Sequence, residues 1–489
     1  MGEMARRSGP LRWLMAMASS LVATAGVAAS DIGTLRLYET PAYSLVVADG
    51  VNAGGIARQI ANFERVLSRT LARDVRPTGT ATHIYVVGDA AWDRYLRPGR
   101  GIDAEFVPRR FSNLLLIDAD LPRRQRREAV FHEYTHLFLH TQFRGSHPLW
   151  FDEGLATMLG ATKLRGGRAI IALPTLKFRG RWIPLPRLFE LDKKSPEYLS
   201  VSDSPDVHLE SWGIVHRGFI DDPAFGASML KFLEALNRFV PAGVAAQDSF
   251  GMSLAALDAS LQGYLSEGKF RGGVIEFEPA QTPSLGKGRR LGELESRTRL
   301  ARVMLDTGFN AQNARALISS AAVLAPGSPD VAVLELRLAL REHDESRAMA
   351  LLGKFPASDA RIAREAALAL VERLDPPGHA ERAYAWLDRA LRADESDAEA
   401  AWGFALAAAH SRRGLDLALA RLDRVRERVP DNADLAMATA LVHEAAGSPE
   451  KMLPWLIETW RYSGDPAQRL HAAQKFRELR ALQRQTAPQ

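Results

Sequence analysis

The sequence feature that most constrains the fold is the pentapeptide His132-Glu-Tyr-Thr-His136, which lies within a largely apolar segment. Two histidines four positions apart lie on the same face of an α-helix, one turn above the other. Their imidazole nitrogens can therefore bind one tetrahedral zinc ion together. Glu133 follows the first histidine and is placed to accept a proton from water that such a site activates. The pattern predicts a helix with two metal ligands and a general base.

A catalytic zinc site also needs a third protein ligand and one open position for water. The segment Trp150-Phe-Asp-Glu-Gly-Leu-Ala156 supplies a candidate in Glu153, seventeen residues after His136. Asp152 and Glu153 point in different directions on a helix, so only one of them is expected to reach the metal. Asp152 is the alternative to Glu153 as this ligand. We therefore expect one zinc ion per chain, held by His132, His136 and Glu153.

The residues before the motif have the context that a functional metal site requires. Phe111–Asp118 is an apolar segment typical of a buried strand. Asp118 or Asp120 is expected to cap the next helix, and Pro122 suits its first turn. Apolar residues at helical spacing would place the histidines on a half-buried face of that helix: Val130, Phe131, Tyr134, Leu137 and Phe138.

His132–His136 followed by Trp150–Ala156 resembles the gluzincin metallopeptidases, and in particular an exported bacterial gluzincin-like family often joined to tetratricopeptide repeats. The resemblance covers residues 40–270 and implies an α+β metallopeptidase domain that acts on peptides or proteins. It implies Glu153 as the third zinc ligand, whereas a metzincin would have a histidine at the position of Gln142. Thr157 stands where the thermolysin branch has an aspartate, so the partner that orients His132 or His136 stays unassigned.

A further departure from the family concerns the oxyanion. The family has a tyrosine near the active site, three residues before a Ser-Trp pair. Here the pair is Ser211-Trp212, and His208 holds the tyrosine position. A histidine can also donate a hydrogen bond to the oxyanion of a tetrahedral intermediate, so His208 is a candidate catalytic residue, with a loop histidine as the alternative. We assign Trp212 and His216 to core packing.

Three other histidines have structural interpretations. His140 lies one turn after His136, where it is expected to support the ligands or to be exposed. His147 precedes Pro148 and is expected to shape the loop before Trp150. His83 opens an apolar strand and is interpreted as structural.

The remaining pattern of residues 31–270 alternates strands and helices. We expect a small sheet beside the motif helix, with one edge near the substrate. The predicted elements before the motif are strands at Tyr43–Ala48 and His83–Val87 and helices at Asn52–Leu71 and Ala90–Leu96. Those after it are a strand at Arg168–Leu173, a loop at Ser195–Pro205 and a helix from Glu210.

Residues 1–29 have the pattern of a secretory signal, with basic residues at Arg6, Arg7 and Arg12 and an apolar stretch at Trp13–Ala25. Val27-Ala-Ala29 offers small residues for cleavage, so the mature chain is expected in the periplasm or outside the cell. An uncleaved membrane anchor is the alternative. The chain has no cysteine, which excludes disulfides and lipidation at a cleavage cysteine. We expect no stable membrane span in the mature chain.

Charge gives little support for a nucleic-acid partner. Lysine and arginine number 63 against 58 aspartate and glutamate, a small excess of +5 for 489 residues. Basic clusters with interleaved aromatic residues are absent from the sequence, and Arg123-Arg-Gln-Arg-Arg is interpreted as the solvated start of the motif helix.

The C-terminal part of the chain repeats. Pro326-Gly-Ser-Pro-Asp, Pro356-Ala-Ser-Asp-Ala, Asp394-Glu-Ser-Asp-Ala and Pro430-Asp-Asn-Ala-Asp each separate two helical patterns, at spacings of 30, 38 and 36 residues. Tetratricopeptide helix pairs repeat every ~34 residues, and their concave face binds peptides or protein partners. The alternative is a plain helical bundle or a lid on the N-terminal domain. The predicted domains are a gluzincin-like domain at 31–270, a linker at 271–290 and tetratricopeptide-like all-α repeats at 291–489.

The sequence therefore favours an exported zinc-dependent metallopeptidase whose repeats bind substrate or a partner. One alternative is a catalytically inactive periplasmic scaffold or chaperone-like adaptor, although a site without activity has no need of Glu133. Another is hydrolysis of a non-peptide amide, such as a cell-wall cross-link.

Overall fold

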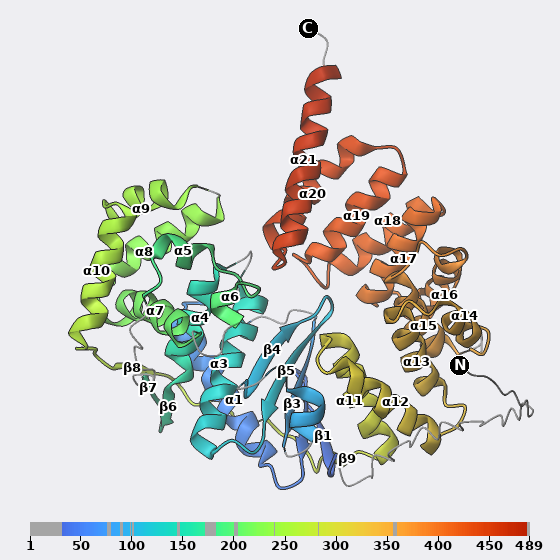
Figure 1. Cartoon of the computed structure of the whole chain (residues 1–489), viewed down its shortest axis with the longest axis horizontal. Helices are drawn as coiled ribbons and strands as arrows, with labels where there is room; N and C mark the ends of the chain where they lie inside the picture. Colours follow the sequence, from blue (N-terminus) through green and yellow to red (C-terminus); the bar gives the residue numbers. More distant parts are fainter. Residues whose placement is uncertain are drawn as a thin grey trace, which may run out of the picture.

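The computed structural model describes residues 32–75, 80–88, 91–97, 99, 102–143, 147–171, 182–199, 204–238, 240–281, 283–355 and 359–486. The expected signal at residues 1–29 lies outside them. Figure 1 shows an N-terminal lobe, with a sheet at its centre and a group of helices at one side, and an arc of helical pairs that ends in a long C-terminal helix. In the described part of the chain, every helix is too short or too polar to cross a bilayer.

The main sheet has six strands in the order β4-β5-β3-β2-β1-β9. Its strands are β1 (Leu35–Glu39), β2 (Ser44–Ala48), β3 (Ala81–Val87), β4 (Ala104–Pro108), β5 (Ser112–Asp118) and β9 (Arg289–Arg290). β2, β3 and β5 are parallel, and the other pairs are antiparallel. The strands expected from the patterns around residues 45, 85 and 115 are thus confirmed as β2, β3 and β5. β4 is an edge strand, with Phe106 opposite Leu115 of β5.

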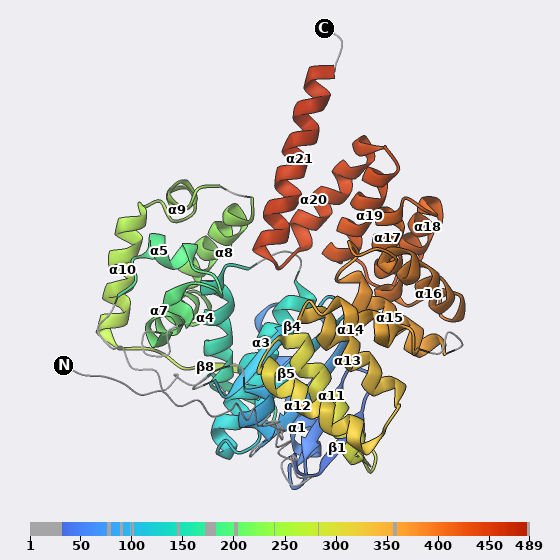
Figure 2. The ribbon, with the colours of Figure 1, turned by 45° about the vertical axis from the view of Figure 1, so that its right-hand side comes forward.

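Both faces of this sheet are buried, each against a different set of helices. One face, with Ile84 and Leu115, packs on α1 (Ala53–Thr70) and α3 (Arg123–Gln142). The other face, with Tyr85 and Leu116, packs on the π-helical turn η2 (Trp92–Leu96) and on the first repeat helices. Figure 2 shows these repeat helices lying across the sheet. The near-continuous apolar strands reflect this two-sided burial.

Two expectations about the helices of this region have different outcomes. The helix predicted over 52–71 is α1, and the Asn52 side chain caps it by accepting a hydrogen bond from the Gly55 N–H at 2.8 Å. The predicted aspartate cap of α3 is wrong. Pro122 is at the cap position, and the Asp118 carboxylate instead accepts from the Asp120 N–H within the turn, at 2.9 Å. A helix N-terminus is often solvated, so α3 does not require a side-chain cap.

A second, three-stranded antiparallel sheet and a group of helices complete the N-terminal lobe. The sheet comprises β6 (Thr162–Arg165), β7 (Arg168–Ile171) and β8 (Gly273–Glu276). The helices are α4 (Leu149–Gly160), α5 (Leu185–Glu190), α6 (Pro196–Leu199), α7 (Ser204–His216), η3 (Arg217–Asp221), α8 (Pro223–Asn237), α9 (Ala242–Phe250) and α10 (Leu254–Glu267).

Three expectations are corrected here. The segment 195–205 contains α6 and the start of α7, so it is not simply a loop. Glu210 lies inside α7, whose apolar face begins before it, and does not start the helix. A strand flanked by linker was expected between Gly268 and Gly288, and this strand is present as β8. The linker expected at 271–290 is not free, because β8 and β9 pair with the edges of the two sheets.

Residues 293–486 form successive helix pairs, which stack so that the first helix of each pair contacts that of the next. The helices are α11 (Glu293–Thr307), α12 (Ala311–Leu324), α13 (Pro329–Arg341), α14 (Glu345–Leu352), α15 (Ala360–Val371), α16 (His379–Ala393), α17 (Ala398–Ser411), α18 (Leu415–Arg426), α19 (Ala433–Ala445), η4 (Pro449–Met452), α20 (Leu453–Tyr462) and α21 (Pro466–Thr486). The predicted turn segments coincide with the junctions between pairs, although residues 356–358 lie outside the described part. Three pairs begin with a side-chain cap, from Asp359, Asp397 and Asn432.

Ion pairs between neighbouring repeats recur at the period of the sequence. They join residues 31 to 33 positions apart: Asp306–Arg337, Asp330–Arg361, Arg364–Asp397, Asp388–Arg421 and Arg426–Glu458. A separation close to the ~34-residue tetratricopeptide period means that each pair joins equivalent helices of successive units. This regular stacking identifies residues 293–486 as a tetratricopeptide-like helical-repeat lobe.

Candidate metal centre

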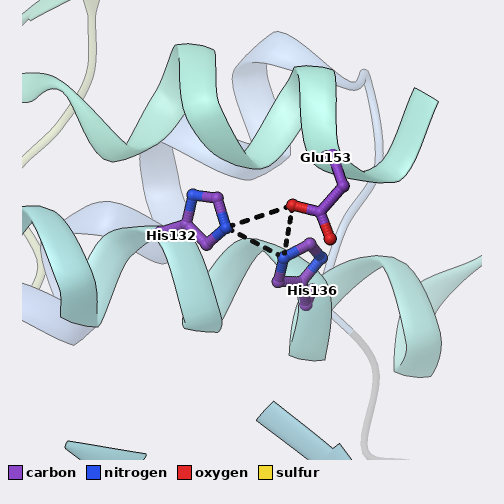
Figure 3. A group of neighbouring side chains, drawn as sticks. All are labelled: His132, His136 and Glu153. Carbon is purple, nitrogen blue, oxygen red and sulfur yellow. Dashed lines mark hydrogen bonds and ion pairs between the residues drawn. The ribbon is translucent and has the colours of Figure 1, made fainter. Parts of the chain in front are cut away.

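The candidate metal ligands are brought together where α3 and α4 cross. His132 and His136 lie on α3, and Glu153 lies on α4. The helices approach closely because Gly160 has no side chain, since a Cβ there would lie 3.3 Å from the Cβ of His132. Figure 3 shows the three side chains pointing toward one another, the two imidazoles from one helix and the carboxylate from the other.

The three potential ligand atoms have the spacing of a tetrahedral site. Nε2 of His132 lies 3.1 Å from Nε2 of His136, and the two nitrogens lie 3.4 and 3.6 Å from Oε2 of Glu153. Ligands at 2.0–2.2 Å from a tetrahedral zinc ion are separated by about 3.4 Å. Two imidazole nitrogens and one carboxylate oxygen are also a ligand set that catalytic zinc uses. The residues present therefore fit a zinc ion.

Glu153 is held in place by the packing of α4 on α7. Gly154 lies at the contact between the helices, where an added Cβ would be 2.3 Å from the carbonyl oxygen of Ser211. Only glycine allows this approach. The close packing brings His208 of α7 to the candidate ligand, with its Nε2 3.3 Å from Oε2 of Glu153. Gly154 is thus required for the close contact between α4 and α7 that positions Glu153.

Asp152 has a different position from the one expected of an alternative ligand. Its Oδ1 lies 3.0 Å from Nδ1 of His136, on the side of the imidazole away from the candidate metal position. A carboxylate at the second ring nitrogen of a ligand histidine fixes its orientation and tautomer. This orienting partner was not predicted from the sequence. The sequence feature that could have predicted this partner is the adjacent pair Asp152-Glu153. Side chains at successive helical positions can reach opposite sides of the same imidazole.

Glu133 lies beside the candidate ligands and contacts the edge of the main sheet. Its Oε2 accepts a hydrogen bond from the backbone N–H of Phe106 on β4, at 2.7 Å. Glu105, next to Phe106, lies near Glu133. Burial of Glu105 is the largest cause that raises its pKa to about 7, and the negative charge of Glu133 is the second. The site is therefore built from the motif helix and from β4 together.

Tyr198 is a further residue at the site that was not predicted. Its hydroxyl donates to Oε1 of Glu153 at 2.8 Å, and its ring stacks on His208 with centroids 5.8 Å apart. Tyr198 lies on α6, within the segment expected to be a loop. A tyrosine is thus present near Glu153 even though His208 occupies the position where the resemblance implies one.

The histidines determine the electrostatic state of Glu153. Burial alone acts to raise its pKa, but the charge of His136 and hydrogen bonds from the surrounding histidines outweigh it, and the pKa of Glu153 is held well below its usual range. The ionised carboxylate is therefore stable in a position where its side chain is only 1% exposed.

The other histidines lie where structural roles were expected, or close to it. His140 is exposed, beside Phe106. His147 lies between the rings of Phe143 and Phe151. His216 is buried beside Trp212 and hydrogen-bonds to Tyr264 at 2.7 Å, while His83 contacts the Ser44 hydroxyl at 2.7 Å.

No protein-family model matches the chain, and no curated protein is similar to it. Three of the similar solved structures are described as TPR or tetratricopeptide repeat proteins, and their TM-scores lie between 0.28 and 0.30. YrrB, described as a TPR protein with an unusual peptide-binding site, is 20% identical over 37% of this chain and 91% of its own, with a TM-score of 0.28. A thermophilic TPR protein of Thermus thermophilus is 20% identical, with coverages of 37% and 98% and a TM-score of 0.30. A tetratricopeptide repeat protein of Parabacteroides merdae is 14% identical, with coverages of 53% and 91% and a TM-score of 0.30. Helix pairing and the inter-repeat ion pairs identify residues 293–486 as repeats.

Proposed function

We propose that the chain is a zinc-dependent metallopeptidase of the gluzincin type. The observation that carries the proposal is the tetrahedral spacing of His132, His136 and Glu153 beside a buried glutamate, Glu133. A structural zinc site needs four protein ligands and no neighbouring base. Three candidate ligands with an adjacent general base are the arrangement of a hydrolytic centre.

Each polar side chain then has a role in amide hydrolysis. Zinc, when bound, polarises the scissile carbonyl and makes water a better nucleophile. Glu133, oriented by the Phe106 N–H, accepts the proton of the attacking water and passes it to the leaving nitrogen. Asp152 keeps Nε2 of His136 directed at the metal position. His208 approaches Oε2 of Glu153, the oxygen that faces the two candidate ligand histidines, and Tyr198 donates to Oε1. Both residues are candidates to donate a hydrogen bond to the oxyanion.

Among the described residues, no further strand pairs with the outer edge of β4, and this edge supports a peptide substrate. Main-chain bonds from Asp118 N to Asp103 O and from Arg109 N to Ser112 O show that the odd-numbered residues of this strand pair with β5. By antiparallel alternation, the carbonyls of Ala104 and Phe106 point away from the sheet. An extended peptide can add to such an edge as a further strand, which would place its backbone beside Glu133. Pro108, which has no N–H, ends the strand as expected at an edge.

The proposed place of action is the periplasm or the exterior, on the strength of the signal pattern at residues 1–29. The repeat lobe is proposed to bind the substrate or a protein partner. An inactive scaffold or chaperone-like adaptor is the second candidate, and it is distinguished by the experiment below.

The test measures zinc content and cleavage of a peptide library for residues 30–489, with the wild type compared with Glu133→Ala. The matched control is Glu128→Ala, which removes a glutamate of the same helix that pairs with Arg124. The proposal predicts one zinc per chain in all three proteins and cleavage by the wild type and the control alone. Zinc in all three and cleavage in none would favour the scaffold. Absence of zinc from the wild type would contradict the site.

A further inference from the structure

The tip of the β4–β5 hairpin inserts into the repeat lobe. In Figure 1, β4 and β5 extend from the sheet toward the helix pairs. At the tip, the Arg110 guanidinium lies over the Trp402 ring, 3.9 Å from its centroid, and Nε of Arg110 lies 3.1 Å from Oδ1 of Asp434. Asn432 donates from its side chain to the Arg110 carbonyl at 3.2 Å. Two repeat helices, α17 and α19, thus contact one arginine.

These three repeat residues form a recognition site, here called the Arg110 pocket (Trp402, Asn432 and Asp434). An aromatic face and a carboxylate are complementary to a guanidinium, and the amide of Asn432 recognises the main chain of the same residue. Phe111 follows Arg110 and packs on the core of the repeats, with its ring 6.1 Å from that of Trp402. The pocket therefore holds an arginine that is followed by an aromatic residue.

The contact between Arg110 and the repeats is partly exposed to solvent, so another arginine can replace Arg110 there. Arg110 is 42% exposed and Asp434 is 26% exposed, so water can replace either partner. A cavity of about 1140 Å³ lies beside the tip, and its walls include Trp402, residues of the hairpin and residues of the first repeats. Another chain segment therefore has space to approach the pocket while the hairpin is still bound.

The same hairpin also supplies a contact to the metal centre. Arg110 follows β4 by two residues, and Phe106 of β4 donates the N–H that orients Glu133. A second contact holds the tip on the repeats, because Arg109 donates to the Asp306 carbonyl of α11. Movement of the tip out of the repeats would thus change the edge strand that contacts Glu133.

We propose that the Arg110 pocket is a binding site for a protein partner with an exposed arginine–aromatic segment, and that the hairpin tip occupies it until the partner displaces it. The partner's arginine takes the position of Arg110 between Trp402 and Asp434, and its aromatic residue takes that of Phe111. Displacement releases the β4–β5 tip and alters the Phe106–Glu133 contact. The binding step is independent of the proposed peptidase activity, while an effect on hydrolysis rests on it.

The probe is a labelled peptide with the sequence of residues 107–113, Val-Pro-Arg-Arg-Phe-Ser-Asn. Fluorescence anisotropy is measured with the full chain. Arg110→Ala removes the guanidinium from between Trp402 and Asp434, so this variant is expected to bind the peptide at least 10-fold more tightly than the wild type. Adding Trp402→Phe or Asp434→Asn to Arg110→Ala is expected to weaken binding at least 10-fold. Arg389→Ala, at an exposed arginine of α16, is the control and should bind like the wild type.

The outcomes separate the pocket from the peptidase. Equal binding by the wild type and Arg110→Ala, or binding that ignores Trp402 and Asp434, would overturn the proposal. A peptide in which alanine replaces the second arginine should fail to bind Arg110→Ala, and its binding would equally overturn it. Circular dichroism confirms that each variant is folded. Peptide binding with the expected pattern but without zinc-dependent cleavage would support the pocket and contradict the proposed peptidase function. Zinc-dependent cleavage without the expected binding pattern would support the peptidase function and contradict the pocket.

Discussion

Oδ1 of Asp152 lies 3.0 Å from Nδ1 of His136, so the imidazole is held from behind by a carboxylate while its other nitrogen faces Glu153. The two carboxylates come from adjacent positions of α4. One short segment of sequence therefore supplies both a candidate ligand and the residue that orients another candidate ligand.

Asp152→Asn is expected to weaken zinc binding 10- to 100-fold, because the amide supports the ligand histidine less strongly than a carboxylate does. Competition with a chromogenic chelator measures the affinity. Asp248→Asn, at an exposed aspartate of α9, is the control and should bind zinc as the wild type does. Equal zinc affinity in both variants would contradict the orienting role.

Gly154→Ala is expected to destabilise the fold by about 1–3 kcal/mol, since the added methyl group would overlap the Ser211 carbonyl where α4 crosses α7. Thermal unfolding measures the change. Gly243→Ala is the matched control, because a Cβ at this helical glycine meets nothing within 4 Å. It should be neutral or slightly stabilising, and a similar loss in both variants would refute the steric explanation.

If the proposed activity is present, His208→Ala is expected to reduce kcat about 100- to 1,000-fold with unchanged zinc content, as loss of an oxyanion donor does in characterised hydrolases. Steady-state kinetics with a cleaved library peptide provides the measurement. His410→Ala, an exposed histidine of α17, should retain full activity. Unchanged turnover by His208→Ala would remove this residue from the mechanism and leave Tyr198 as the donor to examine.

Removal of zinc with a chelator is expected to lower the stability of the wild type, because a ligand that binds only the native state adds about 4 kcal/mol at a 1,000-fold excess over its Kd. Calorimetry with and without added zinc detects the shift. In Glu153→Gln the shift should be much smaller, since one candidate ligand loses its charge. An equal shift in this variant would place the zinc elsewhere.

Glu295 makes the junction between the sheet and the repeats sensitive to acid. A hydrogen bond from Arg289, with support from Arg299, outweighs burial and lowers the pKa of Glu295 to about 2. A group with a lowered pKa stabilises the fold above its unfolded value of about 4.3 and loses this contribution as the pH falls toward the folded value.

Glu295→Gln is therefore expected to cost up to about 1 kcal/mol at pH 7, because the pair is partly exposed and screened. The difference from the wild type should shrink between pH 4 and pH 2. Urea unfolding at several pH values measures it, with Glu267→Gln as an exposed control. A difference that does not depend on pH would exclude the ion pair as the cause.

The sequence was sufficient for the residues whose spacing is fixed by a single helix. His132, Glu133 and His136 share α3, and their relative positions follow from helix geometry alone. The strands β2, β3 and β5 were predictable because apolar runs that are buried on both faces leave a strong pattern. The repeats were predictable because their turns recur at a regular interval.

The sequence was not sufficient for contacts between separate elements. Tyr198 reaches Glu153 from α6, and Phe106 reaches Glu133 from β4, and neither residue belongs to a local pattern that names its partner. The segment 268–288 was expected to be a strand flanked by linker, because glycine and proline surround its apolar residues. The pairing of β8 and β9 depends on sheet edges formed by residues more than 100 positions earlier.

The apolar sheet face that carries Tyr85 and Leu116 determines where this chain can be truncated. Truncation near residue 290, where the sequence alone suggests a clean boundary, would expose that face to water and invite aggregation. The smallest fragment from the N-terminus that covers it must include α11 and α12. The first repeat pair therefore shares its core with the preceding unit, and the domain boundary lies after α12 and not before α11.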